Sequence, residues 1–284
     1  MFTISAFADE ISPDPAEQLA VLKQCRVRFI EFRSIHSTNV LKLDDSQLSQ
    51  WKTMLDSEGF GLSAIGSPVG KVAIDGDFNA HLDLFKHALD VAHRFDCPRI
   101  RIFSYYPPTS TTSDGNWAPY REEVIRRMRV KAELAAKAGV TLFHENEHNI
   151  YGDRPDRVAD LIASVNSASL QAAYDAANWV FCGYDPVEGW ELTKQYTTHL
   201  HIKDWKKPGS TDSGHGYGVI AGTGDGQMKH SILDCVDRDY NGFAVMEPHL
   251  RGGGPTGGFT GADLFPYAVE AFRNLLAECG GVEG

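Results

Sequence analysis

Short apolar runs alternate with longer amphipathic segments along the whole chain. Eight runs have the length and the β-branched and aromatic content typical of buried strands. They cover residues 2–8, 28–35, 61–67, 99–106, 140–146, 170–178, 199–205 and 242–248. The segments between them, such as 15–25, 45–59, 81–95 and 120–139, repeat apolar residues at helical spacing. This alternation predicts a parallel sheet covered by helices.

Local signals support these boundaries and favour one architecture. Asp45 and Ser46 are expected to cap the second helix, and Gly59 and Gly139 stand where helices should end. Eight strand–helix units in 284 residues are close to the size of a (β/α)8 barrel, about 250 residues. We therefore predict an α/β fold, a single (β/α)8 TIM barrel spanning residues 1–284. A doubly wound open sheet is the alternative, but no predicted strand is followed by a GxGxxG loop.

Each of the last four predicted strands ends in a potential metal ligand. These residues are Glu145, Asp175, His201 and Glu247. A single carboxylate at a strand end most often caps a loop or a helix, but four successive ligands are improbable by accident. Active sites of TIM barrels lie at the carboxyl ends of the strands, so the four side chains should converge. This set of oxygen and nitrogen donors suits one divalent ion, with Mn²⁺ as the first expectation and Mg²⁺, Co²⁺ or Zn²⁺ as alternatives.

The fifth predicted strand runs directly into five polar residues, His144, Glu145, Asn146, Glu147 and His148. Side chains alternate in direction along a strand, so Glu145 and Glu147 can point the same way while His144 points elsewhere. We predict that Glu145 is the ligand. Glu147 and His148 are expected to contact substrate, and a solvated loop is the alternative for both.

Composition and charge limit the kinds of molecule that the protein is expected to bind. No apolar run approaches the about 20 residues of a membrane span, and the first residues lack the pattern of a signal peptide, so a cytoplasmic location is expected. The five cysteines are scattered without a CxxC pair, which indicates neither disulfides nor a thiolate zinc site. With 27 Lys+Arg against 38 Asp+Glu, the net charge of −11 disfavours nucleic acid and anionic membranes. A small neutral ligand or a cation fits better, and a homo-oligomer remains open.

The order of the motifs resembles the xylose isomerase-like TIM-barrel superfamily, particularly its sugar (phosphate) isomerase/epimerase branch. The matching pieces are Glu145-Asn146, Asp175-Ala176-Ala177-Asn178, His201-Ile202-Lys203-Asp204, Gly222-Thr223-Gly224-Asp225-Gly226 and Glu247. The resemblance implies a Mn²⁺-type ion held by the four strand-end residues, with Glu145 and Glu247 as the acid–base pair. Asn178 departs from the pattern, because many members have a histidine there. The strand ends have few basic residues, mainly Arg33 and Lys203, which favours a free sugar over a phosphorylated one.

The implied activity is that of a metal-dependent isomerase or epimerase, which acts on a keto sugar or related polyol by proton transfer through an enediolate. If the second carboxylate protonates a departing oxygen instead, the same site is a lyase for keto-inositol dehydration or 3-keto-glycoside elimination. A metal-free glycoside hydrolase is a further alternative, but it leaves Asp175 and His201 without a role. A non-catalytic sugar-binding barrel is disfavoured because both glutamates are intact.

Further substrate contacts are expected from side chains near the strand ends: Asn178, Lys203, His36, His249, Trp179, Trp205, Phe7 and Phe103. The aromatic rings among them could stack on a sugar ring, and packing within the barrel is the alternative for each. Lys203 is expected either to bind a substrate oxygen or to pair with Asp204 in orienting His201. The predicted partner is thus a small carbohydrate.

Overall fold

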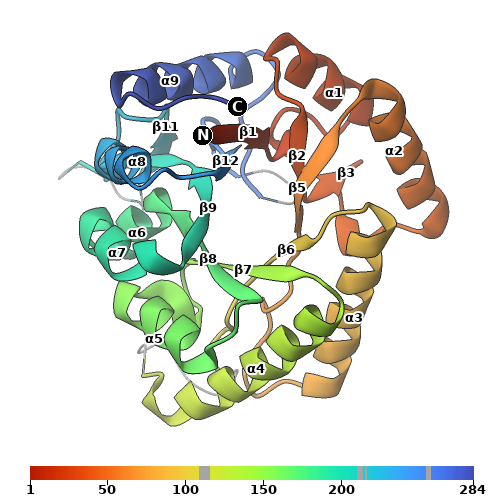
Figure 1. Ribbon diagram of the computed structural model, residues 1–284, viewed down its shortest axis with the longest axis vertical. Helices are drawn as coiled ribbons and strands as arrows, with labels where there is room; N and C mark the ends of the chain where they lie inside the picture. The colour runs from red at the N-terminus through yellow and green to blue at the C-terminus, as the bar shows by residue number, and fades with distance from the viewer. Residues whose placement is uncertain (109–115, 210–213, 215, 254–256) are drawn as a thin grey trace.

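Eight parallel strands close into a barrel in the computed structural model of the chain, which describes residues 1–108, 116–209, 214, 216–253 and 257–284 (Figure 1). The barrel strands are β1 (Phe2–Ala6), β2 (Phe29–Phe32), β5 (Gly61–Gly66), β6 (Arg99–Ile102), β7 (Thr141–Glu145), β8 (Leu170–Asp175), β9 (Thr197–Ile202) and β12 (Gly242–Met246). Pairing of β1 with both β12 and β2 closes the ring. This confirms the predicted TIM barrel and excludes the open doubly wound sheet.

Helices surround the strands on the outside of the barrel (Figure 1). They are α1 (Pro15–Gln24), α2 (Asp45–Glu58), α3 (Phe78–Arg94), α4 (Arg121–Lys137), α5 (Pro155–Val165), α6 (Ala176–Cys182), α7 (Pro186–Thr193), α8 (Met228–Asp237) and α9 (Phe265–Glu278). Short 3-10 helices are η1 (Ala8–Glu10), η2 (Val40–Lys42), η3 (Ala118–Tyr120), η4 (Tyr151–Asp153) and η5 (Lys194–Tyr196). None of the helices in the described part of the chain combines the length and the apolar character that crossing a membrane requires.

The cap of the second helix lies one residue before the first of the two expected positions. Asp44, rather than Asp45 or Ser46, caps α2, because its side chain accepts from the Gln47 amide while the Gln47 side chain accepts from the Asp44 amide. This reciprocal capping box requires Gln47 at the third helical position, which sets the register. Gly59 ends the helix in the left-handed conformation (φ 70°), as expected.

Two register shifts interrupt the regular pairing of the barrel strands. The pairing of β2 with β5 shifts register between Ile30 and Glu31, and the pairing of β8 with β9 shifts between Ala172 and Ala173. Such bulges change the direction of the residues that follow them. Two hairpins extend from strand ends: β3 (Ser34–Ile35) with β4 (Thr38–Asn39), and β10 (Asp204–Lys206) with β11 (Tyr217–Val219).

Candidate metal and substrate site

Four side chains from consecutive barrel strands converge at the carboxyl end of the barrel. Glu145 ends β7, Asp175 ends β8, His201 lies in β9, and Glu247 follows β12. One ligand atom from each of these residues lies within 4.8 Å of the others. All four are buried. The structure thus brings together the whole set that the sequence named as metal ligands.

Strand alternation in β7 separates His144 from Glu145. Glu145 points into the barrel, whereas the buried His144 ring lies against Gly152 in η4, where an added Cβ would come within 2.3 Å of His144 Cε1. Burial and the charge of Lys131 lower the pKa of His144 to about 3, so this ring is neutral. His144 therefore belongs to the layer between strand and helix.

Each of the three clustered carboxylates has a buried cationic partner. Arg101 Nη1 lies 3.1 Å from Glu145 Oε2, and Lys203 Nζ donates to Asp175 Oδ2 at 3.0 Å. Arg33 Nη1 donates to Glu247 Oε1. Burial raises the pKa of Asp175 to about 6, although the charge of Lys203 opposes this shift. The cluster is therefore an acidic centre in which a buried cation lies beside each carboxylate.

The Glu145-Asn146 and Asp175-to-Asn178 motifs form one hydrogen-bonded unit. The Asn146 side chain donates to the Asp175 carbonyl at 2.8 Å and accepts from the Asp175 amide at 2.9 Å. Asn178 Nδ2 donates to Glu145 Oε1 at 3.3 Å, and Asn178 Oδ1 accepts from Lys203 at 2.8 Å. Asn178, at the position where the resemblance led us to expect histidine, thus links the acidic cluster to Lys203.

A cavity of about 170 Å³ lies beside the cluster. It is lined by Glu147, His148, Ala177, Asn178, Phe181, Lys203, Trp205 and His249. Asn178, Lys203, Glu147, His148, Trp205 and His249 were expected at the substrate from the sequence. Polar groups with aromatic rings are a common lining for small polar ligands.

Glu147 is held at the rim of this cavity rather than in the cluster. It accepts from His148 Nδ1 at 2.6 Å and from Lys71 Nζ at 3.0 Å. Burial opposes its ionisation, but the hydrogen bond from His148 and the charge of Lys71 hold the pKa of Glu147 well below its usual range. Glu147 is therefore a fixed negative charge facing the cavity.

Four other expected contacts are not among the residues that line this cavity. Trp179 is buried against Gly189 in α7, and His36 is exposed at the tip of the β3–β4 hairpin; neither is among the residues that line the cavity. Trp179 follows Asn178 on a helix, so its side chain turns about 100° away from the site. Phe7 and Phe103 are completely buried, and the Arg33 guanidinium carbon lies 4.4 Å from the Phe7 ring centroid. The structure therefore does not place Trp179 or His36 at the cavity.

The Gly222–Gly226 loop binds a side chain of this protein. The amides of Gly222 and Gly224 donate to Asp204 Oδ2 at 2.9 Å, and that of Gly226 donates to Asp204 Oδ1 at 3.0 Å. A Cβ at Gly224 would lie 2.2 Å from Asp204 Oδ1. Asp204 thus anchors the loop after β9, and the expected pairing of Lys203 with Asp204 is replaced by pairing with Asp175.

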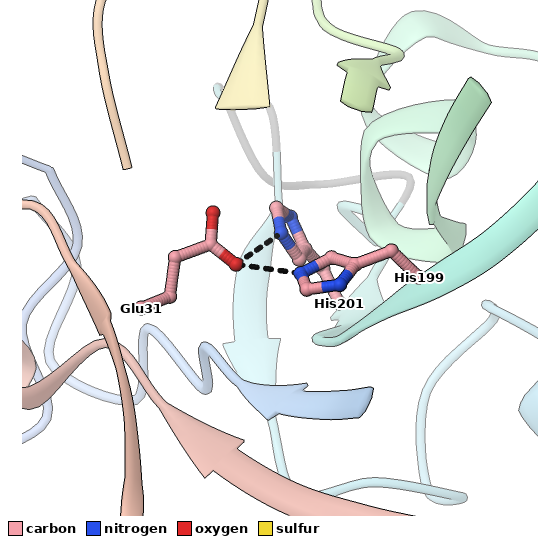
Figure 2. A group of neighbouring side chains, drawn as sticks. All are labelled: Glu31, His199 and His201. Atoms are coloured by element: carbon pink, nitrogen blue, oxygen red, sulfur yellow. Dashed lines mark hydrogen bonds and ion pairs between the residues drawn. The ribbon is translucent and has the colours of Figure 1, made fainter. Parts of the chain in front are cut away.

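The sequence analysis did not predict two buried residues of the site, Glu31 and Arg101. Glu31 Oε2 lies 3.3 Å from His201 Nε2 and 2.7 Å from His199 Nε2 (Figure 2). The available signal was a charged residue inside an apolar strand, as in Phe29–Phe32 and Arg99–Ile102. Fully buried charges usually have a specific partner, so a charged residue within an apolar strand indicates a residue of a buried site.

The donor set fits a divalent cation. His201 Nδ1 and Glu247 Oε2 are buried atoms that have no hydrogen-bond partner among the described residues. Burial disfavours charge on His201, yet Glu145 and Glu31 raise the pKa of His201 well above its usual value, which shows that the cluster favours positive charge. Three carboxylates and an imidazole match the ligand preferences of Mn²⁺, Mg²⁺ and related ions.

A closed (β/α)8 barrel with this cluster at its strand ends defines a TIM-barrel protein able to hold a divalent ion. The model of the xylose isomerase-like TIM barrel family matches residues 19–278, and the chain belongs to this family. The chain is 22% identical over 133 residues to a 3-dehydroshikimate dehydratase of Bacillus anthracis. That alignment covers 47% of this chain and 46% of the relative, so it spans about half of each protein.

Solved structures share the fold over nearly the full length. A D-psicose 3-epimerase with D-tagatose from Clostridium cellulolyticum H10 has a TM-score of 0.71 at 15% identity, covering 99% of this chain and 100% of that chain. A xylose isomerase-like TIM barrel protein from Mycobacterium smegmatis in complex with magnesium has a TM-score of 0.71 at 17% identity, covering 98% and 97%. At these identities the likeness shows the fold alone.

Proposed function

We propose that the protein is a metal-dependent isomerase or epimerase that acts on a keto sugar or related polyol. The observation that carries this proposal is the pair Glu145 and Glu247, two buried carboxylates within one cluster that also offers Asp175 and His201 to a divalent ion. Mn²⁺ is the ion we expect, with Mg²⁺, Co²⁺ or Zn²⁺ as alternatives. The epimerase of the same fold supports this class of reaction.

Isomerisation requires removal of a proton from the carbon beside a carbonyl. One carboxylate of the pair Glu145 and Glu247, ionised at the start of the step, takes this proton from one face of the substrate. The other, protonated before the step begins, returns its proton on the other face, so that an enediolate lies between the two steps. General acid–base catalysis of this type contributes about 10² to 10⁴-fold. A divalent ion in the cluster would supply Lewis-acid withdrawal of charge from the carbonyl.

Other side chains of the site hold the substrate. Lys203 and Asn178 present hydrogen-bonding groups to the cavity, and Phe181 and Trp205 contribute aromatic surface. The ring centroids of Phe181 and Trp205 are 5.8 Å apart in an edge-to-face arrangement. A small polyhydroxylated substrate matches this mixture of polar and aromatic groups.

Elimination is the second candidate function. It is favoured by the match to a 3-dehydroshikimate dehydratase and by the same pair of carboxylates. In this reaction the ionised carboxylate of the pair again removes a proton beside a carbonyl, but the protonated one gives its proton to the departing oxygen, so that water or an alcohol leaves and a double bond remains. Keto-inositol dehydration and 3-keto-glycoside cleavage belong to this class.

Proton exchange with solvent tests the shared first step. The Mn²⁺-loaded protein would be incubated in D₂O with D-fructose, D-psicose, D-tagatose and 3-dehydroshikimate, and deuterium and products followed by NMR and mass spectrometry. An epimer carrying deuterium supports the first proposal, and an unsaturated product supports elimination. The third outcome is that no keto compound shows exchange or turnover, while glycosides are hydrolysed at a rate that EDTA does not change. That outcome would contradict both proposals and would indicate a metal-free glycoside hydrolase.

The cytoplasmic location, the homo-oligomer and the preference for a free over a phosphorylated sugar stay predictions. Fractionation of the source cells, light scattering of the purified protein, and a comparison of free and phosphorylated ketoses as substrates would test them separately.

A further inference from the structure

Glu31 is a charged residue in the interior of the barrel. It lies in β2, directly after the register shift that follows Ile30, and its side chain is fully buried. Arg101 Nε, at 4.0 Å from Glu31 Oε1, is the nearest cation that is not an imidazole. A buried carboxylate is costly unless hydrogen bonds compensate it. Its partners therefore indicate what the residue does.

Those partners are two histidines that share one oxygen atom. Glu31 Oε2 lies 2.7 Å from His199 Nε2 and 3.3 Å from His201 Nε2 (Figure 2). An ionised carboxylate can only accept hydrogen bonds, so each Nε2 atom must carry the hydrogen. The two imidazoles come from the same strand, β9, two positions apart, and therefore face the same side of the sheet.

The other nitrogen of His201 faces the acidic cluster. His201 Nδ1 lies 3.1 Å from Glu145 Oε1 and 3.5 Å from Glu247 Oε2. A hydrogen on Nε2, fixed by Glu31, leaves Nδ1 as the ring nitrogen that can offer a lone pair to a metal ion. Histidine ligands commonly donate their second ring N–H to a carboxylate, which fixes the orientation of the ring and increases its basicity.

We propose that Glu31 is a positioning residue that holds His201 with its hydrogen on Nε2 and its Nδ1 directed at the divalent ion. This inference rests on the proposed metal site and adds a residue that the motifs of the strand ends do not contain.

His199 supports this arrangement through its own hydrogen bond to Glu31 Oε2. Its ring stacks on Phe143 with centroids 4.5 Å apart, and its Nδ1 has no hydrogen-bond partner among the described residues. The hydrogen bond from His199 Nε2 therefore helps to hold the Glu31 carboxylate in place. His199 itself does not belong to the cluster of Glu145, Asp175, His201 and Glu247.

The alternative interpretation is a second metal ion bound by Glu31, His199 and His201, because their ligand atoms also lie within 4.8 Å of one another. Direct hydrogen bonds already join these atoms. His201 would also have to bind one ion through each ring nitrogen, which requires loss of both ring hydrogens. The hydrogen-bonded arrangement needs neither change, so the geometry favours positioning.

Metal affinity tests this inference without an assay of turnover. Mn²⁺ binding would be measured by calorimetry for the wild type, Glu31→Gln and His199→Phe, with a thermal melt of each metal-free protein. Glu31→Gln should lower the affinity by about 10- to 100-fold, as expected for loss of a carboxylate behind a histidine ligand. His199→Phe is the matched control, because it removes the other hydrogen bond to the same oxygen, and it should cause a smaller loss.

A spectroscopic measurement on the wild type covers the case in which Glu31→Gln does not fold. Histidine-labelled protein saturated with diamagnetic Mg²⁺ should give ¹⁵N signals of a His201 ring with hydrogen on Nε2 and none on Nδ1. Equal affinities of wild type and Glu31→Gln, or hydrogen on Nδ1 of His201, would overturn the inference alone. A wild type that binds no divalent ion would overturn the proposed function as well.

Discussion

Arg33 donates from Nη1 to Glu247 Oε1 at 2.8 Å, across 214 positions of sequence. Burial opposes ionisation of Glu247, but the charges of Lys203, His249 and Arg33 hold its pKa well below its usual range. One oxygen of the carboxylate is thus engaged, while Oε2 has no hydrogen-bond partner among the described residues. Arg101 has the corresponding place beside Glu145, so both proposed acid–base groups have a buried arginine behind them.

Removal of Arg33 should destabilise the metal-free protein. Arg33→Met leaves the buried Glu247 without this partner, which typically costs about 3 to 5 kcal/mol. The free energy of unfolding would be measured with denaturant in the presence of EDTA. The double variant Arg33→Met/Glu247→Gln should recover part of the loss, because the charge of Glu247 is removed together with its partner. The recovery should be incomplete, because Asp9 Oδ2 also accepts from Arg33 Nε at 2.8 Å and loses that hydrogen bond in both variants.

Arg28→Met is the control for this experiment. Arg28 is exposed, and its replacement should change stability by no more than about 0.5 kcal/mol. Equal losses for Arg33→Met and Arg28→Met would contradict the importance of the pairing with Glu247.

Two glutamates should differ in their effect on metal binding. Glu247→Gln removes a charged ligand of the cluster and should abolish turnover and weaken Mn²⁺ binding. Glu147→Gln should leave Mn²⁺ binding unchanged, because the Glu147 carboxylate is held by His148 and Lys71 at the rim of the cavity. Calorimetric titration checks both, and loss of the metal from Glu147→Gln alone would show that the ligand set is wrongly chosen.

Lys131 should make stability depend on pH in the alkaline range. Burial and the charge of Arg127 lower the pKa of Lys131 to about 7, whereas a lysine in an unfolded chain has a pKa of about 10.4. Between these values the unfolded chain binds more protons than the folded protein, so this residue makes stability rise with pH, by at most about 1.4 kcal/mol per pH unit. Lys131→Met should remove this rise.

Denaturant unfolding at several pH values between 7 and 10 measures the effect. Lys137→Met is the matched control, because Lys137 is exposed on the same helix, α4. The prediction fails if Lys131→Met and Lys137→Met show the same dependence of stability on pH as the wild type.

Gly224 should tolerate no side chain. In Gly224→Ala the new Cβ would meet Asp204 Oδ1 at 2.2 Å, which would displace the carboxylate from the amides of the loop. We expect a lower melting temperature, and faster proteolysis after β9. Gly253→Ala is the control, since the nearest atom to its Cβ among the described residues would be 4.0 Å away. Equal melting temperatures for the two variants would mean that Asp204 does not anchor the loop.

The strand-end ligands were accessible from sequence because their positions follow from local rules. Alternation of strands and helices predicts the barrel, and in a barrel the carboxyl ends of neighbouring strands meet, so Glu145 and Asp175 must come close once the fold is named. The alternation of side chains also separated Glu145 from His144 correctly, since His144 lies in the layer next to η4.

Contacts that depend on distant elements were not accessible in this way. The position of Trp179 after β8 predicted a residue of the site, but the helical turn of α6 directs its side chain toward α7. The sequence around Glu31 predicted only a strand. The register shift beside Glu31 and closure of the barrel bring its side chain to His201, 170 positions away. The pattern along the chain was sufficient for the fold and for the ends of its strands, because both depend on neighbouring residues. The partners of the buried charges were decided by the tertiary structure, because only closure of the barrel through β1 brings β2 and the residue that follows it, Arg33, close to His201 of β9 and to Glu247 after β12.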